Sequence, residues 1–183
     1  LLEDLVGIYD EPFADSSALP TYRVCELAKK HVTVVLSGDG GDEVIAGYKR
    51  YGLHMDDIAR KQRMPEVMRH ALGSVGQFYP DAAWMPGVLR RRQGLISMGQ
   101  DPVTAFFELN SVMKNDLRRR LYRKDFLRSL QGYTADQVSH RHAAACGSDD
   151  PIALAQYLDM KTYLPGDILT KVDRASMAHA LEV

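Results

Sequence analysis

The sequence predicts an α/β protein that is predominantly helical and has one clear strand at about residues 32–37. The first observation is the run VTVVL, a continuous β-branched segment of the kind that lies buried on both faces in a parallel sheet. The second is the order of its neighbours: a helical pattern precedes the run, and a glycine-rich loop and another helical pattern follow it. Because one strand cannot form a sheet, we expect its partner strands to lie outside these 183 residues.

The first expected helix spans about residues 17–30. Its start is indicated by Asp15, Ser16 and Ser17, whose side-chain oxygens can cap the first backbone N–H groups. Pro20 falls in the first turn, where its missing N–H costs little. Capping is therefore the simplest explanation of both serines.

A second helix is expected to begin near Asp42, after the glycine-rich loop. Val44, Ile45, Tyr48 and Tyr51 keep helical spacing and predict its buried face. We expect both tyrosines to pack in the core.

The remainder of the chain is expected to be mostly helical. Pro65 and Pro102 each follow a helix start, and Asp101 is a plausible N-cap for the second of these. Residues 74–100 lack clear periodicity and predict an ordered loop region, with Trp84 and Met85 filling the core. A helix from about 150 to 163 should end at Leu164-Pro165-Gly166, with short helices beyond it.

Length and composition indicate one soluble globular domain. The chain has 183 residues, 26% charged residues and a net charge of −1, which gives no general attraction to nucleic acid or to an anionic membrane. Two arginine runs, at 90–92 and 118–120, are expected to be solvated. Cys25 and Cys146 lack metal-site spacing and predict free buried thiols in a reducing cytoplasm. The termini indicate a piece of a longer protein.

The segment LSGDGGDEVIAGY, residues 36–48, is the first candidate site. A tight loop between a strand and a helix directs backbone N–H groups into one crevice, where phosphate can bind. Gly38, Gly40 and Gly41 allow a close approach of the backbone to a ligand or a positive φ angle. Asp39, Asp42 and Glu43 suit magnesium that is shared with phosphates. The alternative is a simple turn with capping acids; neither a Walker loop nor a dinucleotide fingerprint is present.

A second cluster lies in YLPGDILTKVDRASMAHALE, residues 163–182. Asp167 and Lys171 have the i, i+4 spacing of an ordinary helical ion pair. However, the cluster alternates charges with apolar residues, so these charges should be half buried and should have partners, often a ligand. Lys171 or Arg174 could therefore balance the charge of a departing pyrophosphate.

Three segments in order resemble the synthetase domain of glutamine-hydrolysing asparagine synthetases. They are DEPFADSSALPTY (10–22), LSGDGGDEVIAGYKRY (36–51) and YLPGDILTKVDRASMAHALEV (163–183). The resemblance covers nearly the whole chain and implies an ATP-pyrophosphatase-type α/β domain. It further implies activation of aspartate as an aspartyl-adenylate, with ATP and Mg²⁺, and attack by ammonia that a separate glutaminase domain makes from glutamine.

The resemblance also implies roles for individual residues. Ser37 and Gly38, with Gly40 and Gly41, would line the nucleotide site, and Asp42 would hold magnesium on the pyrophosphate. Asp39 would lie near the aspartyl-adenylate. Lys171 or Arg174 would stabilise pyrophosphate, and the resemblance does not decide between them.

The departures from the family limit these expectations. The pyrophosphate loop SGGxDS does not occur in residues 1–183, and neither cysteine can replace the catalytic cysteine of the glutaminase domain. We therefore expect a partial synthetase domain over 1–183 that is inactive alone. Two alternatives stay open: amidation or cyclisation of another carboxylate, and a non-catalytic nucleotide-binding module. A homodimer, formed through the edges of VTVVL, is also left open.

Overall fold

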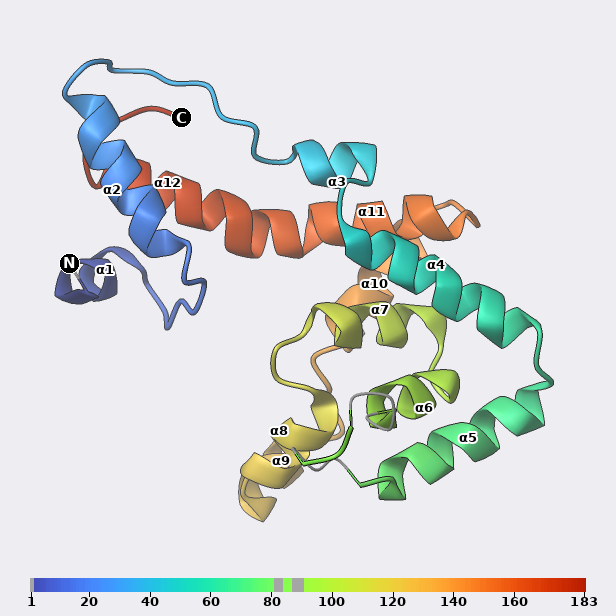
Figure 1. The fold of residues 1–183 in the computed structure, drawn as a ribbon. Helices are drawn as coiled ribbons and strands as arrows, with labels where there is room; N and C mark the ends of the chain where they lie inside the picture. Colours follow the sequence, from blue (N-terminus) through green and yellow to red (C-terminus); the bar gives the residue numbers. More distant parts are fainter. Residues whose placement is uncertain (1, 81–83, 87–90) are drawn as a thin grey trace. The chain divides into compact units, whose positions relative to one another are not determined.

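The computed structural model describes residues 2–80, 84–86 and 91–183 and is predominantly helical (Figure 1). The chain divides into two compact units. The first consists of Leu1–Gly47 with Leu158–Val183, and the second consists of Tyr48–Tyr157. No helix among the described residues is both long enough and apolar enough to span a membrane.

The first unit is built around α2 and α12, which pack side by side (Figure 1). Its helices are α1 (Leu2–Ile8), α2 (Ala18–Lys29), α3 (Gly41–Ile45), the end of α11 (Pro151–Lys161), the π-helix η2 (Leu164–Leu169) and α12 (Thr170–Met177). The core consists of small and medium apolar side chains: Leu5, Ala18, Cys25, Ile168, Ala175 and Leu181. Cys25 is buried, and both cysteines are free thiols, as expected.

The predicted strand at 32–37 is not formed. The described residues contain only an isolated parallel bridge between Val34 and Glu182, in which Val35 N–H donates to the Glu182 carbonyl at 2.8 Å. Val34 is 57% exposed and Leu36 is 99% exposed, so burial on both faces is also wrong. The physical reason is that a strand needs neighbouring strands for its hydrogen bonds, and the described residues supply only this bridge. No parallel sheet is present in the described part of the chain.

The second unit is helical throughout its described residues. Its helices are α4 (Lys49–Gln62), α5 (Glu66–Phe78), α6 (Arg92–Met98), α7 (Pro102–Asn110), α8 (Asn115–Leu121), α9 (Lys124–Ser129), α10 (Gln137–Ala145) and most of α11. Phe106 of α7 stacks on Tyr51 and also contacts His54, both on α4, with ring centroids 6.1 and 5.0 Å apart. These aromatic contacts hold α4 against α7.

Several helix predictions are confirmed. Helix α2 matches the expected 17–30 closely. Asp101 caps α7, since its carboxylate accepts a hydrogen bond from Thr104 N–H at 3.0 Å. Tyr51 is buried as predicted, but Tyr48 is only half-buried and Val44 and Ile45 are 66% and 77% exposed, so the predicted buried face is wrong for these three residues.

Predictions for residues 74–100, for Trp84 and for the helix end at 164–166 are wrong. Residues 74–100 were expected to form a loop, yet α5 continues to Phe78 and α6 occupies part of the region; 81–83 and 87–90 lie outside the described residues. Trp84 is 83% exposed rather than buried, although Met85 is buried. The helical path does not end at 164–166, because Gly166 N–H still donates to the Thr162 carbonyl at 3.0 Å and η2 leads directly into α12.

Helices α5 and α6 approach closely at two glycines. A Cβ atom on Gly73 would lie 2.7 Å from the Gly99 Cα atom, and one on Gly76 would lie 2.7 Å from the Ile96 backbone nitrogen. Both contacts are with backbone, which cannot move aside as a side chain can. The poor helix propensity of glycine is therefore offset here by the close packing of the two helices.

The substitution Gly76→Ala should destabilise the chain by about 1–3 kcal/mol, because the added methyl group overpacks the α5–α6 contact. Gly52→Ala is the matched control: Gly52 is a helical glycine of α4 with open space around its Cα atom, and alanine there should be neutral or stabilising by up to about 1 kcal/mol. Chemical unfolding of both variants measures the difference. Equal stability of the two variants would contradict the packing argument.

His54 should make stability depend on pH. Burial lowers the pKa of His54, and the nearby Lys61 lowers it further while Asp57 opposes the shift. Because the folded state binds the proton less readily than the unfolded state, the unfolding free energy should fall as pH drops below about 6.5. His54→Gln should make the unfolding free energy depend less on pH between pH 7 and pH 5. His70→Gln, at a side chain that is 64% exposed, should leave this pH dependence unchanged.

Candidate active site

The glycine-rich loop at residues 37–42, named here the elbow, adopts a left-handed turn at one residue. Gly40 has φ of +86° and is the N-cap residue of α3, and Gly41 N–H donates to the Gly38 carbonyl at 3.2 Å. This conformation favours glycine, as the sequence predicted. Ser37 and Asp39 are exposed, so the polar side chains of the elbow are accessible to a ligand.

Asp42 lies in the first turn of α3, but the helix is short. It ends at Ile45, and its C-cap residue Ala46 also has a left-handed backbone with φ of +57°. A Cβ atom on Gly47 would lie 2.0 Å from Asp42 Oδ1, so a larger residue there would require the Asp42 side chain to move. The expected single helix from Asp42 through Tyr51 is therefore interrupted, and α4 begins separately at Lys49.

The elbow lies against the π-helix η2. A Cβ atom on Gly40 would be 3.7 Å from both methyl groups of Leu164, which is ordinary van der Waals contact. π-Helical turns are rare and are often found at functional sites. The contact places the elbow beside the segment that leads to Lys171 and Arg174.

Lys171 is held by two side chains from the loop before α2. Its Nζ atom donates to Asp15 Oδ2 at 2.9 Å and to Ser17 Oγ at 2.8 Å, and the residue is only 8% exposed. Ser17 in turn donates its hydroxyl to Asp15 Oδ2 at 2.7 Å and its backbone N–H to Asp15 Oδ1 at 2.8 Å. These three residues, named here the Lys171 cluster, tie α12 to the loop.

The electrostatics of the Lys171 cluster follow from its hydrogen bonds. Burial raises the pKa of Asp15, but the bonds from Lys171 and Ser17 outweigh burial and hold this pKa below its ordinary value. Asp167 shows the opposite behaviour, because burial and the negative charge of Asp15 raise its pKa. The pKa values of these two carboxyl groups are thus shifted in opposite directions, and perturbed pKa values are found at many active sites.

The cluster also corrects the capping explanation of the serines. Ser17 occupies the N-cap position of α2, but its side chain makes no capping hydrogen bond. Its hydroxyl instead bridges Asp15 and Lys171. Local sequence could not reveal this partner, which is 154 residues away.

Arg174, one turn further along α12, is more accessible than Lys171. It pairs with Asp10 across the same loop, and their side chains are 43% and 77% exposed. An ion pair that faces water contributes little to stability and exchanges readily with other charges. Arg174 can therefore reach an anionic ligand at lower cost than Lys171.

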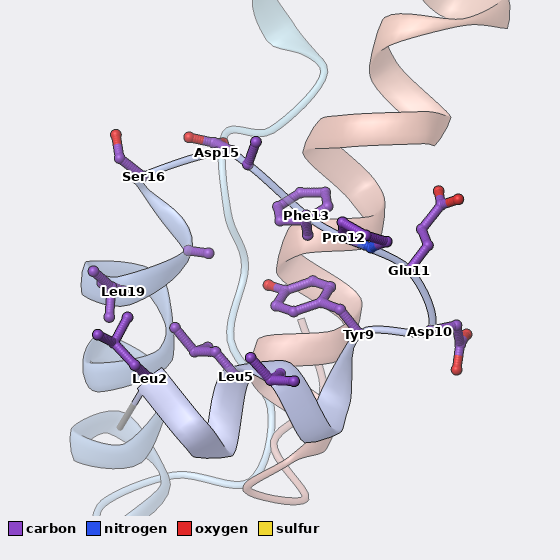
Figure 2. Close-up of a pocket in the computed structure, with 13 residues that line it drawn as sticks. Leu2, Leu5, Tyr9, Asp10, Glu11, Pro12, Phe13, Asp15, Ser16 and Leu19 are labelled. Atoms are coloured by element: carbon purple, nitrogen blue, oxygen red, sulfur yellow. The ribbon is translucent and has the colours of Figure 1, made fainter. Parts of the chain in front are cut away.

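A groove of about 670 Å³ runs between α1, the loop and the start of α2 (Figure 2). Leu2, Leu5 and Leu19 form its apolar part. Figure 2 shows Asp10 and Glu11 on the side away from α2. Tyr9 and Phe13 stack with ring centroids 4.4 Å apart, and Tyr9 donates its hydroxyl to the Lys171 carbonyl at 3.3 Å.

The structure brings some predicted site residues together and leaves others apart. Lys171 and Arg174 both contact the 10–17 loop, whereas no interaction among the described residues joins them to Asp39 or Asp42. Asp10, Asp15, Ser17 and Tyr9 were not among the predicted site residues. The signal that could have found Asp10, Asp15 and Ser17 is the segment DEPFADSS, which carries the family resemblance.

The described residues contain no group of three or more His, Cys, Asp or Glu side chains able to hold a metal ion. Magnesium at the elbow would therefore need ligands besides these residues. Asp39 and Asp42 are both exposed, whereas Glu43 is fully buried, so of the three acids only Asp39 and Asp42 are open to an ion that phosphates also bind.

Comparison with known families gives a match to Asparagine synthase over residues 1–183. The chain belongs to this family. The three segments that carried the resemblance all lie in the first unit or at its border, as does the geometry described above. No solved structure matches the chain.

Curated relatives of the chain are named as asparagine synthetases. It is 30% identical over 184 residues to asparagine synthetase [glutamine-hydrolyzing] 1 of Bacillus subtilis, covering 100% of this chain and 27% of that protein. It is 32% identical to a putative asparagine synthetase [glutamine-hydrolyzing] of Mycobacterium tuberculosis, with 100% and 26% covered. A putative Methanocaldococcus jannaschii protein of the same kind is 33% identical, with 97% and 32% covered. The chain thus spans about a quarter to a third of these relatives.

Replacing Lys171 by Met should destabilise the chain by about 2 kcal/mol at pH 7, because Asp15 loses its charged donor. The pKa of Asp15 is depressed in the fold, so this stabilisation is present above about pH 4 and is lost as pH falls through the folded pKa. The difference in unfolding free energy between wild type and variant, measured by chemical unfolding, should therefore be smaller at pH 3 than at pH 7. Lys30→Met, at an exposed lysine, is the control and should change little. A difference in unfolding free energy that does not change with pH would contradict the role of the ion pair.

Proposed function

We propose that the full protein converts aspartate to asparagine by ATP-dependent amidation through an aspartyl-adenylate. The observation that carries this proposal is the match of the whole chain to the Asparagine synthase family. The curated relatives are named as glutamine-hydrolyzing, which supports glutamine as the ammonia source. The order of the three segments, DEPFADSS, SGDGGDE and LTKVDRASMA, supports the same assignment.

In this proposal the elbow forms one wall of the nucleotide site. Ser37 and Gly38 line it through their backbone, and Gly40 and Gly41 allow the close approach. The left-handed turn at Gly40 and the exposure of Ser37 support this role. Asp39, exposed at the tip of the elbow, would lie near the acyl-adenylate.

Asp42 is proposed to bind Mg²⁺ together with the phosphates of ATP. The ion would neutralise charge on the phosphates as pyrophosphate departs. Asp42 is exposed, and its carboxylate lies close to the backbone of Gly47. A ligand can therefore reach this carboxylate from solvent.

The geometry favours Arg174 over Lys171 as the cation that meets pyrophosphate. Lys171 is nearly buried, and two of its three N–H groups are used by Asp15 and Ser17. Arg174 is half exposed, and its partner Asp10 is mostly exposed. We assign Lys171 to positioning the loop and Arg174 to contacting the anion.

The 183 residues are proposed to form part of a synthetase domain, with the nucleotide loop and the glutaminase domain supplied by other segments of the full protein. The chain covers only 27–32% of the length of these relatives, which supports this view. Residues 1–183 alone should then be inactive. Two alternatives are amidation or cyclisation of another carboxylate and nucleotide binding without turnover.

The test is pyrophosphate release by the full protein with ATP, Mg²⁺ and glutamine, with and without aspartate. We expect release that depends on aspartate and falls at least about 100-fold in Asp42→Ala, in line with the loss of an electrostatic stabiliser. Asp56→Ala, at an exposed aspartate of α4, is the control and should retain activity.

Other outcomes select among the alternatives. Release that does not depend on aspartate would move the acceptor to another carboxylate. If a folded protein releases no pyrophosphate, the alternative of nucleotide binding without turnover is supported. If Arg174 rather than Lys171 contacts pyrophosphate, Arg174→Gln should lower kcat without loss of stability, whereas Lys171→Met should lower both.

A further inference from the structure

The second unit contains a cavity of about 500 Å³ that is lined mostly by residues with polar or charged side chains. Residues from α5, α6, α7 and α8, together with the segment before α10, contribute to it, and Ile96 is the one aliphatic side chain among them. Its volume lies within the range of small-molecule sites.

The acidic groups of this cavity already have partners. Asp116 forms an ion pair with Arg92 at 2.7 Å, and Asp136 accepts hydrogen bonds at 3.4 Å from Thr104 and from Asn115. Glu108 accepts the backbone N–H of Asn115 at 2.9 Å. The ion pair neutralises Asp116, and hydrogen bonds engage oxygen atoms of Asp136 and Glu108, which keep their negative charge.

The remaining polar groups are unpaired within the part of the chain that the structure describes. They comprise two guanidinium groups, three carboxamides and one hydroxyl, from Arg119, Arg120, Gln77, Gln93, Gln100 and Thr134. Guanidinium groups bind phosphate or carboxylate through charge-assisted hydrogen bonds. Carboxamides both donate and accept, and so match the hydroxyl groups of a polyol.

The segment that contributes Arg119 and Arg120 to the cavity is positively charged. Residues 114–128 carry seven Lys and Arg against two Asp, a local net charge of +5 in a chain whose total is −1. Arg119 and Arg120 are exposed, as expected for that arginine run, whereas Arg92 is half-buried by its ion pair. The field of this segment would raise the local concentration of anions at the cavity.

We propose that this cavity binds a small polyhydroxylated anion of the sugar-phosphate class. Arg119 and Arg120 hold the phosphate, and the carboxamides of Gln77, Gln93 and Gln100 receive the hydroxyl groups. Every residue involved belongs to the second unit. The site is therefore separate from the amide-forming chemistry proposed for the elbow and does not depend on it.

The test is isothermal titration calorimetry on the full protein with three probes: glucose 6-phosphate, glucose and inorganic phosphate. We expect saturable binding of glucose 6-phosphate, roughly tenfold or more tighter than binding of either phosphate or glucose, since only this probe engages both sets of groups. Affinity should fall as salt is raised, because the arginines face water.

Two variants assign the contacts. The double substitution Arg119→Gln and Arg120→Gln should abolish the advantage of glucose 6-phosphate over glucose. Arg123→Gln with Arg128→Gln removes the same charge from exposed arginines outside the cavity and should change affinity little. Gln93→Ala should weaken binding of glucose 6-phosphate while leaving that of phosphate unchanged.

Three results would overturn the proposal. They are no binding of glucose 6-phosphate at millimolar concentration, equal affinity for glucose 6-phosphate and phosphate, and equal losses in the two double variants, which would indicate general attraction of anions to the basic segment. Pyrophosphate release is measured separately, so failure of the synthetase assignment leaves these outcomes unaffected.

Discussion

The ion pair between Lys171 and Asp15 is the contact on which the arrangement of the first unit depends. It joins α12 to the loop before α2, and Ser17 completes it by bonding to both partners. The same loop carries Asp10 to Arg174 and Tyr9 to the Lys171 carbonyl. Because buried charges are costly unless they are paired and hydrogen-bonded, the loop and α12 stabilise each other's position.

This arrangement separates two cations that look equivalent in the sequence. Lys171 and Arg174 lie three residues apart on one helix, yet one is nearly buried and the other is half exposed. The buried cation holds the loop, and the exposed cation is left to meet a ligand. The π-helix before them places Leu164 against Gly40 and so brings the elbow beside the start of η2.

Much of the candidate site was predictable because glycines and caps act locally. The turn at Gly40, the helix over 17–30 and the cap at Asp101 follow from neighbouring residues and are confirmed. The run VTVVL has a strand's composition but forms a single bridge, since a strand depends on partners far away in the sequence. Likewise, α5 and α6 replace a predicted loop because Gly73 and Gly76 let the two helices pack closely.

The sequence by itself determined the family of this protein, the elbow with its acids and glycines, and the presence of two candidate cations in the last segment. These features depend on residue type and spacing along the chain. Only the tertiary structure decided that Ser17 and Asp15 bond to Lys171 instead of capping a helix, and that polar groups from several helices meet around one cavity. The reason is that such contacts join residues distant in the sequence, and their energies depend on burial and on partners that no local pattern reveals.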